Sequence, residues 1–137
     1  MILLLDTNTC IYLIKRRPPE VLRKFEGYAV GDIGVSSITA AELYLGTQKS
    51  LRPAQNGRAL EQFLFPLAIA EFDQAAADTY GHVRVALERG GTPIGSLYTL
   101  IAAHALSLEA TLVTSNVREF ARVAGLRIEN WVDGEKS

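Results

Sequence analysis

Short apolar runs alternate with helix-like segments along the whole chain, and this alternation constrains the fold more than any other feature of the sequence. The first run, residues 2–5, is wholly apolar, as expected for a strand buried on both faces of a parallel sheet. Further strands are expected at 33–37, 67–72, 111–114 and 126–128. Strands that alternate with helices form βαβ units with parallel pairing. The sequence therefore predicts an α/β fold of three layers, with a short central parallel sheet flanked by helices.

Caps and prolines mark the boundaries of the expected helices. Thr7 and Asn8 can cap the first helix, which the Pro18-Pro19 pair ends. A cap at Asp73 opens a long helix that runs to the Gly90-Gly91 pair. The other helices are expected at 19–26, after Ser37 or Thr39, at 53–65, from Gly95 to about 108, and at 116–120.

Length and composition favour one compact domain over residues 1–137. Hydrophobic residues make up 48% of the chain and charged residues 21%, which excludes a disordered protein. The single cysteine cannot form an internal disulfide. The apolar run ILLL before Asp6 has only four residues, too few for a signal peptide core or a membrane span. We therefore expect a cytoplasmic protein with no membrane partner.

Three acidic residues are candidates for a site. Asp6 directly follows the first strand, so it either caps the next helix or serves a site, and two alternative caps behind it weaken the capping explanation. Glu42 lies on a helix whose inner positions are small or apolar, so it is either a solvated residue or an inward carboxylate. Glu119 follows the strand at 111–114 and is either a site residue or an ordinary surface glutamate.

These acids can meet only if the sheet brings the strand ends together. In a parallel α/β sheet, ligands bind at the carboxyl ends of the strands. Clustered carboxylates raise one another's pKa unless a cation neutralises them, and Mg²⁺ or Mn²⁺ prefers oxygen ligands. The sequence thus predicts a hard-cation site. Polar residues near the strand ends that could support it, each also a common turn or cap residue, are Asn8, Ser37, Thr114 and Asn116.

A basic cluster follows the first expected helix. Lys15, Arg16 and Arg17 could neutralise the phosphates of a nucleic acid, or they could form a solvated helix end. The net charge of −1 neither favours nor excludes a polyanionic partner. No zinc-ligand spacing, nucleophile triad or glycine-rich phosphate loop is present in the sequence.

Four segments in register resemble the PIN-domain ribonuclease toxins of the VapC type. They are LLLDTN, SSITAAELYLG, PIGSLYTLIAAHALSLEATLVTSNVREF and GLRIENW, and together they span essentially the whole chain. The resemblance implies a Mg²⁺- or Mn²⁺-dependent endoribonuclease that cuts structured RNA, commonly tRNA. It also implies that Asp6, Glu42 and Glu119 are the catalytic and metal-binding acids, with Asn116 beside them.

The resemblance further implies the partners of the chain. Such toxins are held inactive by a small VapB-type antitoxin, and they reach operator DNA only through that antitoxin. They usually form homodimers whose sites line a shared groove. The C-terminal segment of the antitoxin typically occupies this groove.

Tyr98 departs from the family pattern. VapC-like proteins normally carry an aspartate of the metal site where this chain has Tyr98. A tyrosine is neutral near pH 7, because its reference pKa is about 10, and its phenol is a poor ligand for Mg²⁺. Two explanations remain open: a natural member that has lost or altered catalysis, or an inactivating substitution that permits a toxic protein to be produced. We favour the second, because the other acidic positions remain. The alternative function is a catalytically inactive module that binds the antitoxin.

Overall fold

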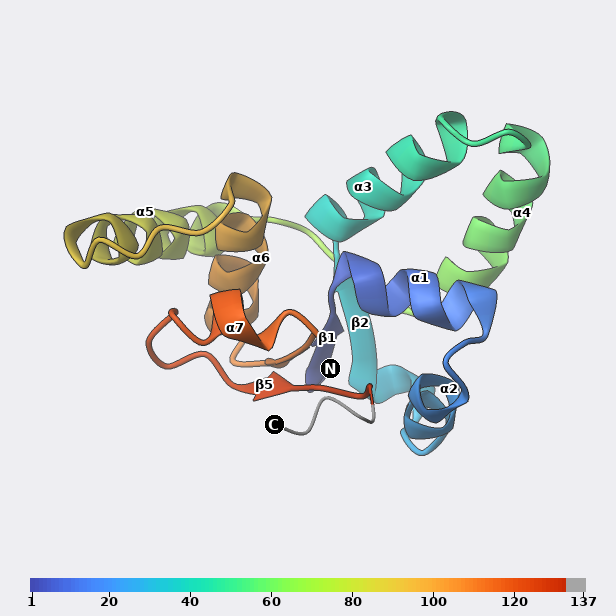
Figure 1. Cartoon of the computed structure of the whole chain (residues 1–137), viewed down its shortest axis with the longest axis horizontal. Helices are drawn as coiled ribbons and strands as arrows, with labels where there is room; N and C mark the ends of the chain where they lie inside the picture. The colour runs from blue at the N-terminus through green and yellow to red at the C-terminus, as the bar shows by residue number, and fades with distance from the viewer. Residues whose placement is uncertain (133–137) are drawn as a thin grey trace.

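A parallel sheet runs through the centre of the molecule, and helices cover both of its faces (Figure 1). The computed structural model describes residues 1–132. Within them the sheet has five strands in the order β3-β2-β1-β4-β5, and every neighbouring pair is parallel. The predicted α/β class with a flanked parallel sheet is confirmed. The strands are β1 (Leu3–Leu5), β2 (Ile33–Ser36), β3 (Ala68–Ala70), β4 (Thr111–Val113) and β5 (Ile128–Glu129).

The helices lie within about two residues of the predicted positions. None of those in the described part of the chain has the length and apolar character needed to cross a membrane. The single-domain prediction covers 1–137, so its last five residues lie outside the described part. The helical segments are α1 (Thr7–Lys15), α2 (Pro19–Glu26), the 3₁₀ turn η1 (Val30–Asp32), α3 (Ser37–Gln48), α4 (Pro53–Leu64), α5 (Gln74–Arg89), α6 (Ser96–Ser107) and α7 (Val117–Phe120).

The sequence offered three residues as caps of α1, and the structure uses one of them. Neither Thr7 nor Asn8 caps the helix; Asp6 does, because its Oδ1 accepts a hydrogen bond from the backbone N–H of Thr9 at 2.8 Å. Asp6 has extended backbone angles, φ −80° and ψ 174°, which an N-cap requires. The residue that leaves the strand is therefore the one that opens the helix.

The same rule corrects the start of α3. The strand β2 ends at Ser36 rather than at residue 37, and the Ser36 hydroxyl accepts from the backbone N–H of Ile38 at 3.0 Å. The helix begins at Ser37, but its cap is Ser36 and not Ser37 or Thr39. Both strand-to-helix transitions at the centre of the sheet use the last extended residue as the cap.

The two edge strands differ from the predicted positions. β3 covers only Ala68–Ala70 of the predicted 67–72, because the chain turns away from the sheet and the backbone N–H of Phe72 donates to the Ser37 hydroxyl at 3.1 Å. β5 lies at 128–129 rather than 126–128. An edge strand pairs on one side only, so its length depends on the neighbouring strand more than on its own pattern.

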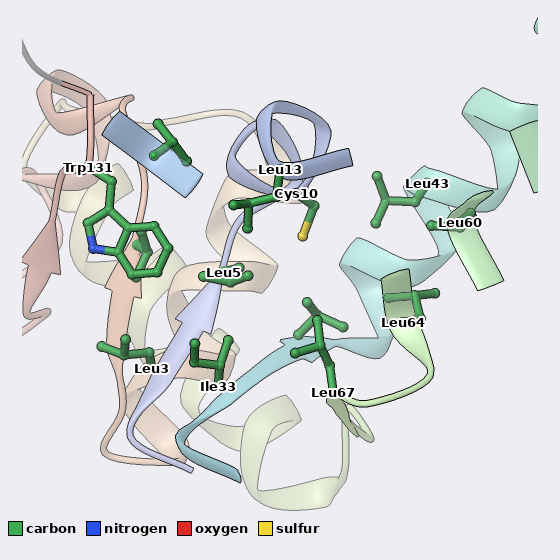
Figure 2. Packing of buried hydrophobic residues seen from close by; sticks show 13 residues of the cluster. Leu3, Leu5, Cys10, Leu13, Ile33, Leu43, Leu60, Leu64, Leu67 and Trp131 are labelled. Carbon is green, nitrogen blue, oxygen red and sulfur yellow. The ribbon is translucent and has the colours of Figure 1, made fainter. Parts of the chain in front are cut away.

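Two hydrophobic cores form, one on each face of the sheet. Leu3 and Leu5 of β1 face a core built with α1, α2 and α4, which Trp131 closes (Figure 2). Leu4, on the opposite side of the strand, faces a second core built with α5, α6 and α7. This division explains why Leu3–Leu5 are wholly apolar, since neither face of the strand meets water. The predicted strand began at Ile2, but that residue lies outside β1 and is exposed.

The register of the central strands sets the place of the site. Leu5 is the Cα partner of both Val35 and Val113, so the residues that follow these three strands meet at one edge of the sheet. Asp6 and Thr114 are consequently neighbours, although they are far apart in the sequence.

Candidate functional site

Asp6 and Glu42 lie at one pocket, at the carboxyl edge of the sheet. Its volume is about 90 Å³. Asp6 comes from the end of β1, whereas Glu42 comes from the middle of α3, so two separate βα units supply the two carboxyl groups. The residues that line the pocket are Asp6, Thr7, Asn8, Glu42, Tyr98, Ile101 and Phe120.

Asp6 combines the two roles that the sequence offered as alternatives. It caps α1 through Thr9 and also lines the pocket, and it is only 5% exposed. Burial raises the pKa of the Asp6 carboxyl, hydrogen bonds from Thr114 and Thr9 oppose this rise, and the charge of Glu42 adds to it. The ionised carboxyl is thus poorly solvated beside a second acid, and a positive group in the pocket would stabilise it.

Glu42 points inward rather than into solvent. Its Oε1 accepts a hydrogen bond from the Thr7 hydroxyl at 2.6 Å, and the residue is half-buried. This bond ties α3 to the first turn of α1. The sequence reasoning considered Thr7 only as a helix cap and missed this contact, although its position directly after the strand end was a usable signal.

Tyr98 forms one wall of the pocket. It lies in the first turn of α6, half-buried, and its ring is 5.4 Å from that of Phe120 with an interplanar angle of 55°. A Cβ added at Gly95 would lie 3.4 Å from the Tyr98 ring, so the backbone before the helix packs closely against it. Phe120 is fully buried in the second core. The packing of that core therefore holds the wall of the pocket that Phe120 forms.

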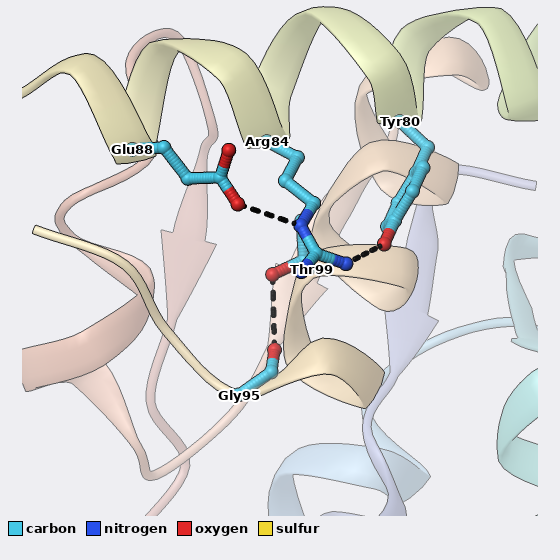
Figure 3. A network of polar contacts seen from close by, with 5 residues as sticks. All are labelled: Tyr80, Arg84, Glu88, Gly95 and Thr99. Carbon is cyan, nitrogen blue, oxygen red and sulfur yellow. Dashed lines mark hydrogen bonds and ion pairs between the residues drawn. The ribbon is translucent and has the colours of Figure 1, made fainter.

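The start of α6 and the neighbouring helix α5 each carry local polar contacts. The Thr99 hydroxyl donates to the carbonyl of Gly95 at 2.9 Å, which closes the first turn of the helix (Figure 3). On α5, Arg84 donates to Glu88 at 2.9 Å and to the Tyr80 hydroxyl at 2.6 Å. The pair on α5 is exposed and contributes little stability, whereas α5 itself packs along α6.

Glu119 is not among the residues that line the pocket. It is half-buried on α7, next to Phe120 in the sequence. Residues 1–132 contain no group of three or more His, Cys, Asp or Glu side chains placed to hold a metal ion. Two carboxyl groups and a phenol do not make a complete site for Mg²⁺ or Mn²⁺. A role of Glu119 in such a site stays a prediction.

The predicted supporting polar residues divide into two groups. Asn8 lines the pocket, and Thr114 is buried with its hydroxyl on Asp6, while it accepts from the backbone N–H of Asn116 at 2.9 Å. Ser37, in contrast, lies outside the pocket and holds the chain that leaves β3. Residues directly after β1 and β4 therefore contribute side chains to the site. The β2 unit contributes Glu42, which lies on the helix that follows the strand.

A larger groove adjoins the pocket. Its volume is about 440 Å³, and it lies between α1, α3 and α4. Thr7 and Glu42 line both cavities, so the groove leads directly to the two acids. Apolar side chains such as Ile11, Leu43 and Leu60 form much of its wall.

The basic cluster lies at the other end of α1. Lys15 is the last residue of the helix and also lines the groove. Arg16 is the C-cap, with a left-handed backbone at φ 59°, and Arg17 follows it. All three side chains are exposed.

Comparisons with known proteins show the family of the chain. A family model described as PIN domain matches residues 3–126. Ribonuclease VapC2 of Haemophilus influenzae is 47% identical over 129 residues, which cover 94% of this chain and 97% of the relative. The tRNA(fMet)-specific endonuclease VapC of Salmonella typhimurium is 42% identical over 128 residues, covering 93% of this chain and 96% of the relative.

Solved structures extend the likeness to three dimensions. The chain is similar to one in the crystal structure of VapBC2 from Rickettsia felis bound to a DNA fragment from their promoter, with a TM-score of 0.90, 41% identity, and coverage of 96% of this chain and 100% of that chain. For DNA-bound VapBC from Salmonella typhimurium the TM-score is 0.91, with 41% identity and coverage of 96% and 99%. The chain belongs to the VapC family of PIN-domain proteins.

Proposed function

We propose that this chain is a ribonuclease toxin of a type II toxin–antitoxin pair, and that Tyr98 impairs its cleavage of RNA. The observation that carries the proposal is the pocket in which Asp6 and Glu42 meet with Tyr98 at the wall. The names of two relatives describe ribonucleases, and one of these acts on tRNA(fMet). We therefore propose tRNA as the substrate.

Metal dependence is part of the proposal. In a chain with a third carboxyl at position 98, oxygen ligands from Asp6 and Glu42, joined by Glu119 directly or through water, would suit Mg²⁺ or Mn²⁺. The poor solvation of the Asp6 carboxyl, which raises its pKa, supports a role for a cation. The neutral phenol of Tyr98 supplies no such charge, and its ring takes space in a pocket of about 90 Å³. We infer that the chain as it stands binds such ions weakly.

Cleavage assays with three proteins test this function. Initiator tRNA is incubated with Mg²⁺ or Mn²⁺ and the unsubstituted chain, Tyr98→Asp, or Tyr98→Phe. We expect Tyr98→Asp to cleave on the order of 100-fold faster than the unsubstituted chain, because loss of a ligand costs at least as much as loss of its supporting contacts. Tyr98→Phe keeps the ring without the hydroxyl and should stay slow. Equal rates for the unsubstituted chain and Tyr98→Asp would contradict the proposal.

A second control separates the carboxyl of Asp6 from its capping role. Asp6→Asn in the Tyr98→Asp background keeps an oxygen that can accept from Thr9 but removes the charge. We expect this double variant to fold and to lose cleavage. Full cleavage by the double variant would remove Asp6 from the catalytic residues.

The second candidate function is a non-catalytic module that binds an antitoxin. The groove beside the pocket favours it, since an apolar wall that ends at Glu42 suits an amphipathic peptide with a basic side chain at one end. Two similar crystal structures are of VapBC bound to DNA. We propose a VapB-type antitoxin as the partner, contact with operator DNA through that antitoxin, and a homodimer. Tight partner binding by a chain that stays inactive after Tyr98→Asp would favour this function over the first.

The basic cluster is proposed as an RNA contact. Lys15, Arg16 and Arg17 are exposed at the end of α1, and Lys15 also lines the groove that leads to Glu42. Contacts of this kind with phosphates give affinity that does not depend on sequence and that falls with salt.

A further inference from the structure

His104 is a buried polar residue for which the proposed chemistry has no use. It lies on α6 and is 0% exposed. Its Nδ1 is 2.8 Å from the hydroxyl oxygen of Ser36, the residue that caps α3. The chain contains two histidines, and the other, His82, is exposed on α5. A buried imidazole between two helices costs solvation energy, so its contact calls for an explanation.

The groups around the ring bear on the direction of this contact. The Ser36 oxygen accepts from the backbone N–H of Ile38 at 3.0 Å, and a hydroxyl can still donate one hydrogen bond or accept a second. The backbone carbonyl of Glu71 interacts with the ring as an acceptor, so we assign the proton of the neutral ring to Nε2 and the acceptor of the Ser36 hydroxyl to Nδ1. Nε2 is buried and makes no hydrogen bond of acceptable geometry within the described residues, although the backbone carbonyl of Glu71 faces the ring.

We infer that neutral His104 is a positioning residue for Glu42: by accepting the Ser36 hydroxyl, it fixes the cap of α3 and so the place from which Glu42 enters the pocket. The inference rests on the proposed function, in which Glu42 is a site residue. Glu42 lies within two turns of Ser36 on one continuous helix, so a shift of the cap moves its side chain. The 2.6 Å bond from Thr7 to Glu42 depends on this placement.

The contact is sensitive to protonation. A charged imidazole donates from both nitrogens, so it cannot accept the Ser36 hydroxyl. The groups around the ring are Asp73 at the start of α5, the Glu71 carbonyl, and the edge-on ring of Phe72, with centroids 5.2 Å apart. Burial lowers the pKa of His104, whereas Asp73 and Glu71 oppose this change. The neutral form is therefore favoured in the fold.

The sign of the pH effect follows from that direction. Because the pKa is lower in the folded chain than in the unfolded chain, the stabilising contact is fully present above the ordinary histidine range. It is lost as the pH falls from that range through the lowered pKa. The cap of α3 should loosen over the same pH interval.

An NMR titration of the unsubstituted chain tests the coupling without any substitution that affects folding. Between pH 8 and about pH 4.5, the ring signals of His104 and the backbone amide of Ile38 should change with one common midpoint, below the ordinary histidine range. In His82→Asn, the matched control, the Ile38 change should persist. An Ile38 amide that keeps its shift while His104 titrates would overturn the inference.

Two substitutions distinguish positioning from simple packing. Asn can accept from Ser36 with its side-chain oxygen but does not titrate, whereas Leu fills the space without an acceptor. His104→Asn should keep the amide shifts of Ile38 and Glu42 near those of the unsubstituted chain and make them independent of pH over the histidine range. His104→Leu should displace them at every pH. Equal spectra for Asn and Leu at residue 104 would overturn the inference.

Cleavage provides an independent readout. In the Tyr98→Asp background, His104→Leu should cleave RNA about tenfold more slowly, the cost of one misplaced site group, and His104→Asn should recover most of the rate. If Tyr98→Asp itself does not cleave RNA, the proposed function fails. The NMR arms still decide the role of His104 in that case.

Discussion

Replacing Tyr98 by aspartate should lower the free energy of unfolding, because ring packing is lost. Binding of a metal ion by the new carboxyl should then restore it. The ring of Tyr98 packs on Phe120 at 5.4 Å, and such pairs contribute about 0.5–1.5 kcal/mol beyond the area they bury. Loss of the half-buried ring surface costs about 1–2 kcal/mol more. We therefore expect Tyr98→Asp without metal to unfold with a free energy lower by about 2–3 kcal/mol. For a chain of this length the Tm falls by about 6–12 °C.

Electrostatics acts in the same direction. The new carboxyl would enter a pocket in which burial already raises the pKa of Asp6 and Glu42 raises it further. A third acid adds repulsion, so the loss should grow as the pH rises above the carboxyl range.

Added Mn²⁺ or Mg²⁺ should reverse the loss. An ion that binds only the folded chain, at 100 times its Kd, stabilises by about 2.7 kcal/mol. The assay is calorimetry at pH 7.5 with EDTA and with increasing Mn²⁺. Tyr98→Ala is the matched control, because it loses the same ring but gains no carboxyl. Its Tm should fall and should not respond to the ion.

The outcome that would refute the reasoning is specific. If Mn²⁺ raises the Tm of Tyr98→Asp and Tyr98→Ala by the same amount, the ion does not bind through the carboxyl at residue 98. The pocket would then not be the proposed cation site.

Two further predictions concern the sheet and the basic cluster. A Cβ at Gly34 would lie 2.8 Å from the backbone oxygen of Ala68 on β3, so Gly34→Ala should lower the free energy of unfolding in urea by about 1–3 kcal/mol. A Cβ at Gly57 on α4 would meet nothing within 4 Å, so Gly57→Ala should raise the free energy of unfolding by about 0.5–1 kcal/mol. A similar loss of unfolding free energy in both variants would contradict the packing argument. Alanine at residues 15–17 should weaken RNA binding and flatten its dependence on salt, and unchanged affinity would exclude this cluster as an RNA contact.

Several elements of the fold could be predicted because their signals are local. The cap at Asp73 and the Pro53 helix start each depend on residues close in the sequence, and both are found where expected. The apolar run at 2–5 also forms a strand, one residue shorter than expected, at Leu3–Leu5. The edge strand β3 was placed less well, since its end is set by the bond from Phe72 to Ser37, two residues that only the fold brings together.

The candidate site was only partly predictable for the same reason. Asp6 and Glu42 were identified as candidates from their local patterns, and the structure brings both to one pocket. The bond from Thr7 to Glu42 and the wall formed by Phe120 were missed, because each joins residues on separate elements. No pattern of the sequence says which face of α7 meets the pocket, so Glu119 could not be placed.

By itself, the sequence determined the class of fold, since the alternation of apolar strands and helices allows few arrangements other than a flanked parallel sheet. It also determined that an aspartate ends the first strand and that a tyrosine stands at residue 98. The tertiary structure alone decided that Asp6 both caps α1 and lines the pocket, and that His104 reaches the cap of α3. The physical reason is that strand register and helix packing set distances between residues far apart in the chain, and local residue patterns carry no record of those distances.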